Sequence, residues 1–121
     1  MFFDDLLARF GESLGMQDLC FDERDRCEFE FERLGHLQLE KKEDHLSVAL
    51  SQTYDRFNPS MASKALAQSH FNSIFRYPVR AGLSKDERLV FFVQLDQSQA
   101  DLSILEQVLD ELSERFRQLA A

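Results

Sequence analysis

Two cysteines and three histidines are the most chemically versatile residues in this sequence. Cys20 and Cys27 have six residues between them, with no CxxC pair and no second ligand cluster. The histidines stand at positions 36, 45 and 70, without the HxxxH or HExxH spacing that gathers metal ligands on one helix face. We therefore expect no metal site. Free thiols are the default, with Cys27 as a small buried hydrophobe and a disulfide to Cys20 as the less favoured alternative.

The sequence contains no recognisable catalytic template. The four glycines, at positions 11, 15, 35 and 82, form neither GxGxxG nor a P-loop, and GxSxG is absent. A thiol nucleophile would require a histidine brought near a cysteine by the fold. The row Glu28, Glu30 and Glu32 offers paired carboxylates, but its alternation with apolar residues favours a solvated strand face, since a catalytic carboxylate usually needs an apolar pocket. We expect no enzyme and no cofactor.

Charge and composition narrow the class further. The formal net charge is -8 and the sequence pI about 4.8, so most of the surface should repel a phosphate backbone and nucleic acid is not an expected partner. Hydrophobic residues make up 44% and charged residues 30%, with no run approaching a membrane span. The first residues are acidic where a secretory signal would be basic. These features predict a protein of the cytoplasm.

The first half of the chain changes from helical to strand periodicity. Apolar residues from Phe3 to Leu14 recur at spacings of three and four, which predicts an amphipathic helix ended by Gly15. Phe29 and Phe31 then alternate with the glutamate row, and we expect Lys41 and Lys42 of the next strand to neutralise that row. With a turn at 43–44 and a third strand from residue 46, the segment predicts an antiparallel meander.

The second half continues the α+β pattern. A helix is predicted over 61–75, then strands over 77–83 and 88–96, with the run 89–93 apolar on both faces. A final helix from Leu102 carries Ser103 and Glu106 at capping-box spacing. The predicted order is α-βββ-α-ββ-α in a single domain, residues 1–121, with a twisted, mainly antiparallel sheet packed with helices.

The sequence has more apolar residues than one sheet packed with one layer of helices is expected to bury. The chain has 12 Phe and no Trp, an amphipathic first helix, and a strand that is apolar on both faces. We expect part of this surface to be buried between two copies of the chain or offered to a partner protein.

This arrangement resembles the class I type III secretion chaperones, the CesT-like or Tir-chaperone family, over nearly the whole chain. The residues that carry the resemblance are the opening 3–11, the strands around 29–31 and 46–48, and the strand 89–95 leading into 102–105. The small size and acidic pI are also similar to that family.

The resemblance implies a cytoplasmic homodimer that binds the amino-terminal region of a secreted effector in extended form and keeps it export-competent, without ATP or turnover. For the dimer interface it points to Leu66, Phe71, Ile74, Phe75 and Val79. For a groove between the first helix and the sheet it points to Phe3, Leu6, Leu7, Phe10, Phe29 and Phe31. Effector strands are also expected to add to an exposed sheet edge.

Two alternatives stay open. One is a regulatory protein of the same fold that sequesters a control protein in place of an effector. The other, less favoured, is an enzyme or small-ligand binder, which would require one deep pocket containing a perturbed Asp, His or Tyr.

Overall fold

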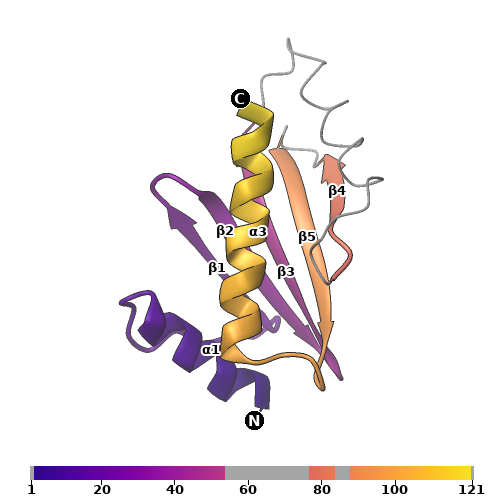
Figure 1. Ribbon diagram of the computed structural model, residues 1–121. Helices are drawn as coiled ribbons and strands as arrows, with labels where there is room; N and C mark the ends of the chain where they lie inside the picture. Colours follow the sequence, from indigo (N-terminus) through magenta and orange to yellow (C-terminus); the bar gives the residue numbers. More distant parts are fainter. Residues whose placement is uncertain (1, 54–76, 84–87, 121) are drawn as a thin grey trace.

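In the part of the chain that the structure describes, two helices lie against one face of a five-stranded antiparallel sheet (Figure 1). The computed structural model describes residues 2–53, 77–83 and 88–120. The helices are α1 (Phe2–Ser13) and α3 (Leu102–Ala120). The strands are β1 (Arg26–Phe31), β2 (Gly35–Lys42), β3 (His45–Thr53), β4 (Arg80–Leu83) and β5 (Arg88–Asp96). The predicted α+β class is confirmed, and the helix predicted over 61–75 lies outside the described residues.

The sheet has the strand order β1-β2-β3-β5-β4, with every neighbouring pair antiparallel. Strands β1 to β3 form the predicted meander. In Figure 1, β1 is the left edge of the sheet and β4 is the right edge. Because side chains alternate along a strand, each strand sends one set of residues toward the helices and the other set to the opposite face, called the open face below.

Helix α1 forms where the sequence predicts it. Its apolar stripe faces inward, and Gly15 has a φ of +80°, the left-handed conformation that ends many helices. The N–H of Met16 donates to the carbonyl of Gly11 at 2.8 Å, and that of Gly15 donates to the carbonyl of Glu12 at 3.0 Å. These two bonds are the Schellman pattern, which satisfies carbonyls left over at the end of the helix.

The two hairpins of the meander use different turns. Lys42 pairs with His45, so Glu43 and Asp44 make the tight turn that the sequence predicts. Phe31 pairs with Gly35, which has a φ of +112°. A Cβ at Gly35 would lie 2.3 Å from the carbonyl oxygen of Ser51. This hairpin therefore requires glycine for both its backbone conformation and its space.

Strand β5 has the bounds that the sequence predicts. Its residues Leu89, Phe91 and Val93 are fully buried toward the helices, whereas Val90 and Phe92 on the open face are half-buried. The strand predicted over 77–83 is shorter, since β4 begins only at Arg80. Pro78 precedes it and has no N–H to give to a ladder.

The cap of α3 differs from the prediction. The N–H of Ile104 donates to Oδ1 of Asp101 at 2.8 Å, so Asp101 is the capping residue. Ser103 lies inside the helix, where its hydroxyl accepts a bond from Gln107. The predicted capping box of Ser103 and Glu106 is therefore wrong. The acidic side chain that caps the helix stands two residues earlier.

One continuous core joins both helices to the sheet. It includes the α1 stripe, the inward residues of β1 to β3 and β5, and the inward residues of α3. Phe91 of β5 and Phe116 of α3 meet edge to face, with ring centroids 4.9 Å apart and an interplanar angle of 70°. This core holds α1 and β1 in the positions that define the surface described next.

Candidate partner-binding surface

Phe29 and Phe31 are the predicted partner-binding residues that retain accessible surface. Both are half-buried in β1 and pack at the margin of the core. Their rings meet edge to face, with centroids 5.1 Å apart and an interplanar angle of 72°. A pair of aromatic rings at the margin of a core, on an edge strand, offers an apolar contact that needs no rearrangement of the fold.

The α1 residues predicted for the same groove lie inside the core. Phe3, Leu6, Leu7 and Phe10 are 6%, 3%, 1% and 1% exposed. Their packing against α3 and the sheet leaves almost no surface for a partner in the single chain. Phe2, next to Phe3, is 45% exposed and is the large apolar side chain of α1 that faces outward. A role in partner binding for the buried stripe stays a prediction.

Of the residues predicted for a dimer interface, only Val79 is described. It is 7% exposed and belongs to the core just before β4. Leu66, Phe71, Ile74 and Phe75 lie outside the described residues. Their role also stays a prediction.

The glutamate row finds a different partner from the one expected. His36 lies between two carboxylates, with Nδ1 2.9 Å from Glu30 and Nε2 3.4 Å from Glu28. Arg88 of β5 approaches Glu30 at 3.8 Å. This follows from the β1–β2 register, in which Glu30 is opposite His36.

Lys41 and Lys42, which the sequence predicted as partners of the glutamate row, form ion pairs with other carboxylates. Nζ of Lys41 donates to both carboxylate oxygens of Asp4 at 2.9 and 3.1 Å, lies 3.9 Å from Asp25, and stands 5.0 Å from the ring centroid of Phe21. Lys42 approaches Glu40 at 3.8 Å. The prediction was wrong for two reasons. Odd-numbered residues of β2 point toward the helices, so Lys41 faces α1 and lies on the opposite face from Glu28 and Glu30. Lys42 pairs with His45 at the 43–44 turn and lies beyond the part of β2 that pairs with β1.

The Lys41–Asp4 pair ties the start of α1 to the sheet. The hydrogen bond from Lys41 lowers the pKa of Asp4, and the same bond raises the pKa of Lys41. An open hollow of about 490 Å³ adjoins the pair and includes Phe2 and Phe3 in its lining. Sequence reasoning missed this contact because it joins residues 37 apart.

The reactive groups of the described residues are arranged for structure. Burial raises the pKa of Cys27 to about 11, so at neutral pH this side chain is a thiol and a poor nucleophile. Cys27 is buried as predicted, and Cys20 is exposed. No group of three or more His, Cys, Asp or Glu side chains is placed to hold a metal ion in the part of the chain that the structure describes.

No helix within the described residues is both long and apolar enough to cross a membrane. Among curated protein sequences, none matches the chain.

Solved structures share this fold at low sequence identity. The *Yersinia pestis* type III secretion chaperone SycH, in complex with a fragment of YscM2, is 18% identical with a TM-score of 0.74, covering 97% of this chain and 98% of that one. The HopA1–SchA chaperone–effector complex contains a chain that is 19% identical with a TM-score of 0.71, at 97% and 94% coverage. A chain of the ExoU–SpcU complex from the type III secretion system of Pseudomonas aeruginosa is 18% identical with a TM-score of 0.66, covering 96% of this chain and 93% of that one.

The family assignment rests on sequence as well as fold. The family model for the type III secretory system chaperone SycN matches residues 2–119, which is almost the whole chain. The match covers α1, all five described strands and all but the last residue of α3. This chain therefore belongs to the SycN family of type III secretory system chaperones.

Proposed function

We propose that this chain binds the amino-terminal region of a secreted effector in extended form and keeps it soluble and competent for export. The observation that carries this proposal is the family match over residues 2–119. Support comes from the solved structures of the same fold, which include a chaperone–effector complex and the ExoU–SpcU complex. The negative charge and the aromatic pair at the margin of the core fit a protein partner.

The proposed groove lies along α1 and the helix-facing side of β1. Phe29 and Phe31 give its apolar contact, whereas exposed Phe2 lies toward the other end of β1, beside Asp25 and Lys41. Phe3, Leu6, Leu7 and Phe10 shape its wall from within, because their side chains fix α1 against the sheet. Anchoring by a few apolar side chains is the usual source of affinity at such surfaces.

The proposal includes no catalysis and no cofactor, and it places the chain in the cytoplasm. The buried thiol of Cys27 and the ion-paired Asp4 both have structural explanations. The hollow beside Asp4 is lined largely by charged side chains, which does not favour an enzyme or small-ligand site. A regulator that sequesters a control protein would use the same surface, so the identity of the partner separates the two readings.

The experiment is co-purification of the tagged full chain from the cytoplasm of the cell that makes it, followed by identification of the bound protein. We expect a secreted protein whose capture is lost when its amino-terminal region is deleted. Capture through another region, or of a protein that is never exported, would contradict the proposal. A captured control protein would favour the regulatory alternative.

We also propose that the working unit is a homodimer. Both described helices lie on one face of the sheet, while the open face carries half-buried Val90 and Phe92. Sedimentation should give twice the chain mass of 14.1 kDa. Phe71→Asp should release monomers, since it would bury an unpaired charge in the predicted contact. A monodisperse species of 14.1 kDa at micromolar concentration would rule out the dimer.

A further inference from the structure

Strand β1 lies at one edge of the sheet. Among the described residues β1 pairs only with β2. The N–H of Lys41 donates to the carbonyl of Asp25 at 2.9 Å, across the β1–β2 pair. Because backbone groups alternate in direction along an antiparallel strand, the odd-numbered residues of β1 turn theirs toward β2 and the even-numbered residues turn theirs outward.

Asp22 closes the first part of this edge. The N–H of Arg26 donates to Oδ1 of Asp22 at 3.0 Å, and its carbonyl accepts from the N–H of Asp22 at 2.7 Å. The bond from Arg26 also lowers the pKa of the Asp22 carboxyl. Both outward backbone groups of Arg26 are thus satisfied within the chain. Pairing with another strand is left to the outward backbone groups of Glu28 and Glu30.

The two faces of β1 at Glu28–Phe31 differ in chemistry. On the open face, His36 lies between Glu28 and Glu30, whose side chains nevertheless stay 46% and 65% exposed. On the helix side, Phe29 and Phe31 present half-buried rings. A strand added here would place its residues directly opposite these four, alternately against a carboxylate and against a ring.

We propose that the Glu28–Phe31 edge binds an extended segment in which basic and apolar residues alternate. The proposal rests on the proposed function, in which the partner binds in extended form, and it adds the sequence pattern that this edge selects. Backbone pairing alone is indifferent to sequence. Selectivity comes from the charges opposite Glu28 and Glu30 and from the apolar side chains opposite Phe29 and Phe31. An acidic segment would meet like charges and the net charge of -8.

Synthetic peptides test the proposal on the full chain. The probes are an alternating Lys/Val ten-residue peptide, its Glu/Val counterpart, and the Lys/Val peptide with a central Pro. Titration into isotope-labelled protein should shift the amide signals of Glu28 and Glu30 with the Lys/Val peptide alone. Equal binding of the Lys/Val and Glu/Val peptides, or shifts confined to other elements, would overturn the proposal.

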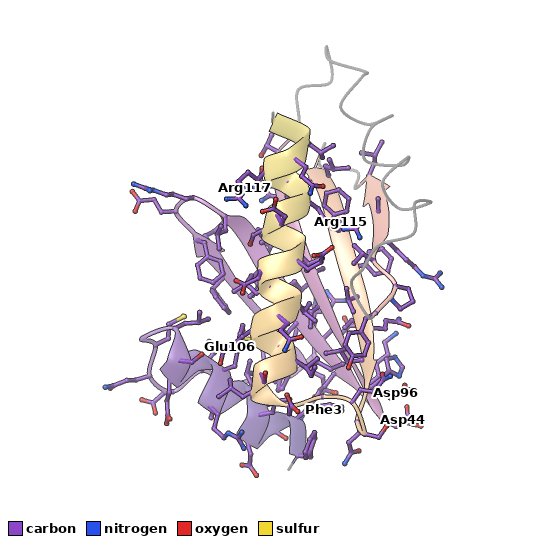
Figure 2. All side chains as sticks on the ribbon, viewed as in Figure 1. Phe3, Asp44, Asp96, Glu106, Arg115 and Arg117 are labelled. Atoms are coloured by element: carbon purple, nitrogen blue, oxygen red, sulfur yellow. The ribbon has the colours of Figure 1, made fainter. Side chains whose placement is uncertain are left out.

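Charge reversal supplies the matched variants. Glu28→Lys with Glu30→Lys should weaken the Lys/Val peptide on the order of tenfold and allow the Glu/Val peptide to bind. The control, Glu43→Lys with Glu106→Lys, has the same net charge but places its changes in the β2–β3 turn and on α3, where Figure 2 shows Glu106 in the helix layer. Equal loss in both double variants would mean that overall charge, and not this edge, attracts the peptide.

A backbone variant separates strand pairing from charge. Glu28→Pro removes an outward N–H and leaves the β1–β2 ladder in place, whereas Glu28→Gln removes only the charge. We expect Pro to abolish binding and Gln to weaken it modestly, with circular dichroism confirming that both variants fold. If the Pro variant misfolds, the Pro-containing peptide gives the same test from the other side. Binding of that peptide equal to the unbroken one would overturn strand pairing.

These outcomes are distinguishable from failure of the proposed function. If a secreted partner is captured through its amino-terminal region while no peptide binds the β1 edge, only the edge proposal fails. If no such partner exists, the proposed function fails whatever the peptides do.

Discussion

Phe10→Ala is expected to lower the free energy of unfolding by about 3–5 kcal/mol. Phe10 is 1% exposed and is among the largest fully buried side chains, so its truncation leaves a cavity between α1 and the rest of the core. Phe2→Ala on the same helix is the matched control, because Phe2 is 45% exposed and its loss should cost less than about 1 kcal/mol. Urea denaturation of the full chain measures both.

Comparing Phe10→Ala with Phe31→Ala shows how α1 contributes to partner binding. Phe31→Ala removes a half-buried ring and should weaken partner binding while the chain stays folded. If Phe10→Ala left stability unchanged and weakened only binding, the α1 stripe would be a contact surface and its packing in the core would have to be rejected.

Gly35→Ala should be the second severe substitution, with a loss of about 3 kcal/mol or more. The φ of Gly35 is +112°, and an added Cβ would stand 2.3 Å from the carbonyl oxygen of Ser51, a backbone atom that cannot rotate away. Displacing it would disturb the β1–β2 hairpin and the edge that hairpin presents.

Gly82→Ala provides the control for that substitution. Gly82 lies in β4, and a Cβ there meets no atom within 4 Å. Its unfolding free energy should stay within about 0.5 kcal/mol of the parent. Similar losses at the two glycines would show that the cost is generic to this sheet and does not come from the conformation of Gly35.

Local patterns in the sequence predict much of the fold. The α1 stripe, the end of that helix at Gly15, the 43–44 turn and the bounds of β5 all follow from periodicity or from the conformational freedom of glycine. Each of these depends on residues close together in the chain. The family resemblance agrees with the family match over residues 2–119.

Features that depend on register or tertiary packing could not be predicted in the same way. Which cation meets Glu30 is decided by the β1–β2 register, and the sequence pattern pointed to Lys41 and Lys42 instead of His36. Likewise, the apolar stripe of α1 shows that one face of this helix must be buried. The stripe looks the same in the sequence whether that face packs against α3 and the sheet or against a partner protein. The structure assigns that cover to the core of the chain itself.

The candidate site also contains features that the sequence predicted and features that it did not. The sequence singled out Phe29 and Phe31 by their alternation with glutamates, and the structure places them together on an edge strand. The closure of that edge by Asp22 had no sequence signal, because it depends on a loop folding back on Arg26. Edge strands need such protection against uncontrolled pairing, and here it stops before Glu28.

We propose that this chain keeps a secreted partner ready for export. The most direct test compares the amount of the co-purified partner inside and outside cells that have or lack this chain, with synthesis of the partner monitored in parallel. We predict that cells without the chain make the partner at an unchanged rate, export less of it, and retain the remainder in degraded or insoluble form. Unchanged export and solubility of that partner would show that this chain is not its export chaperone.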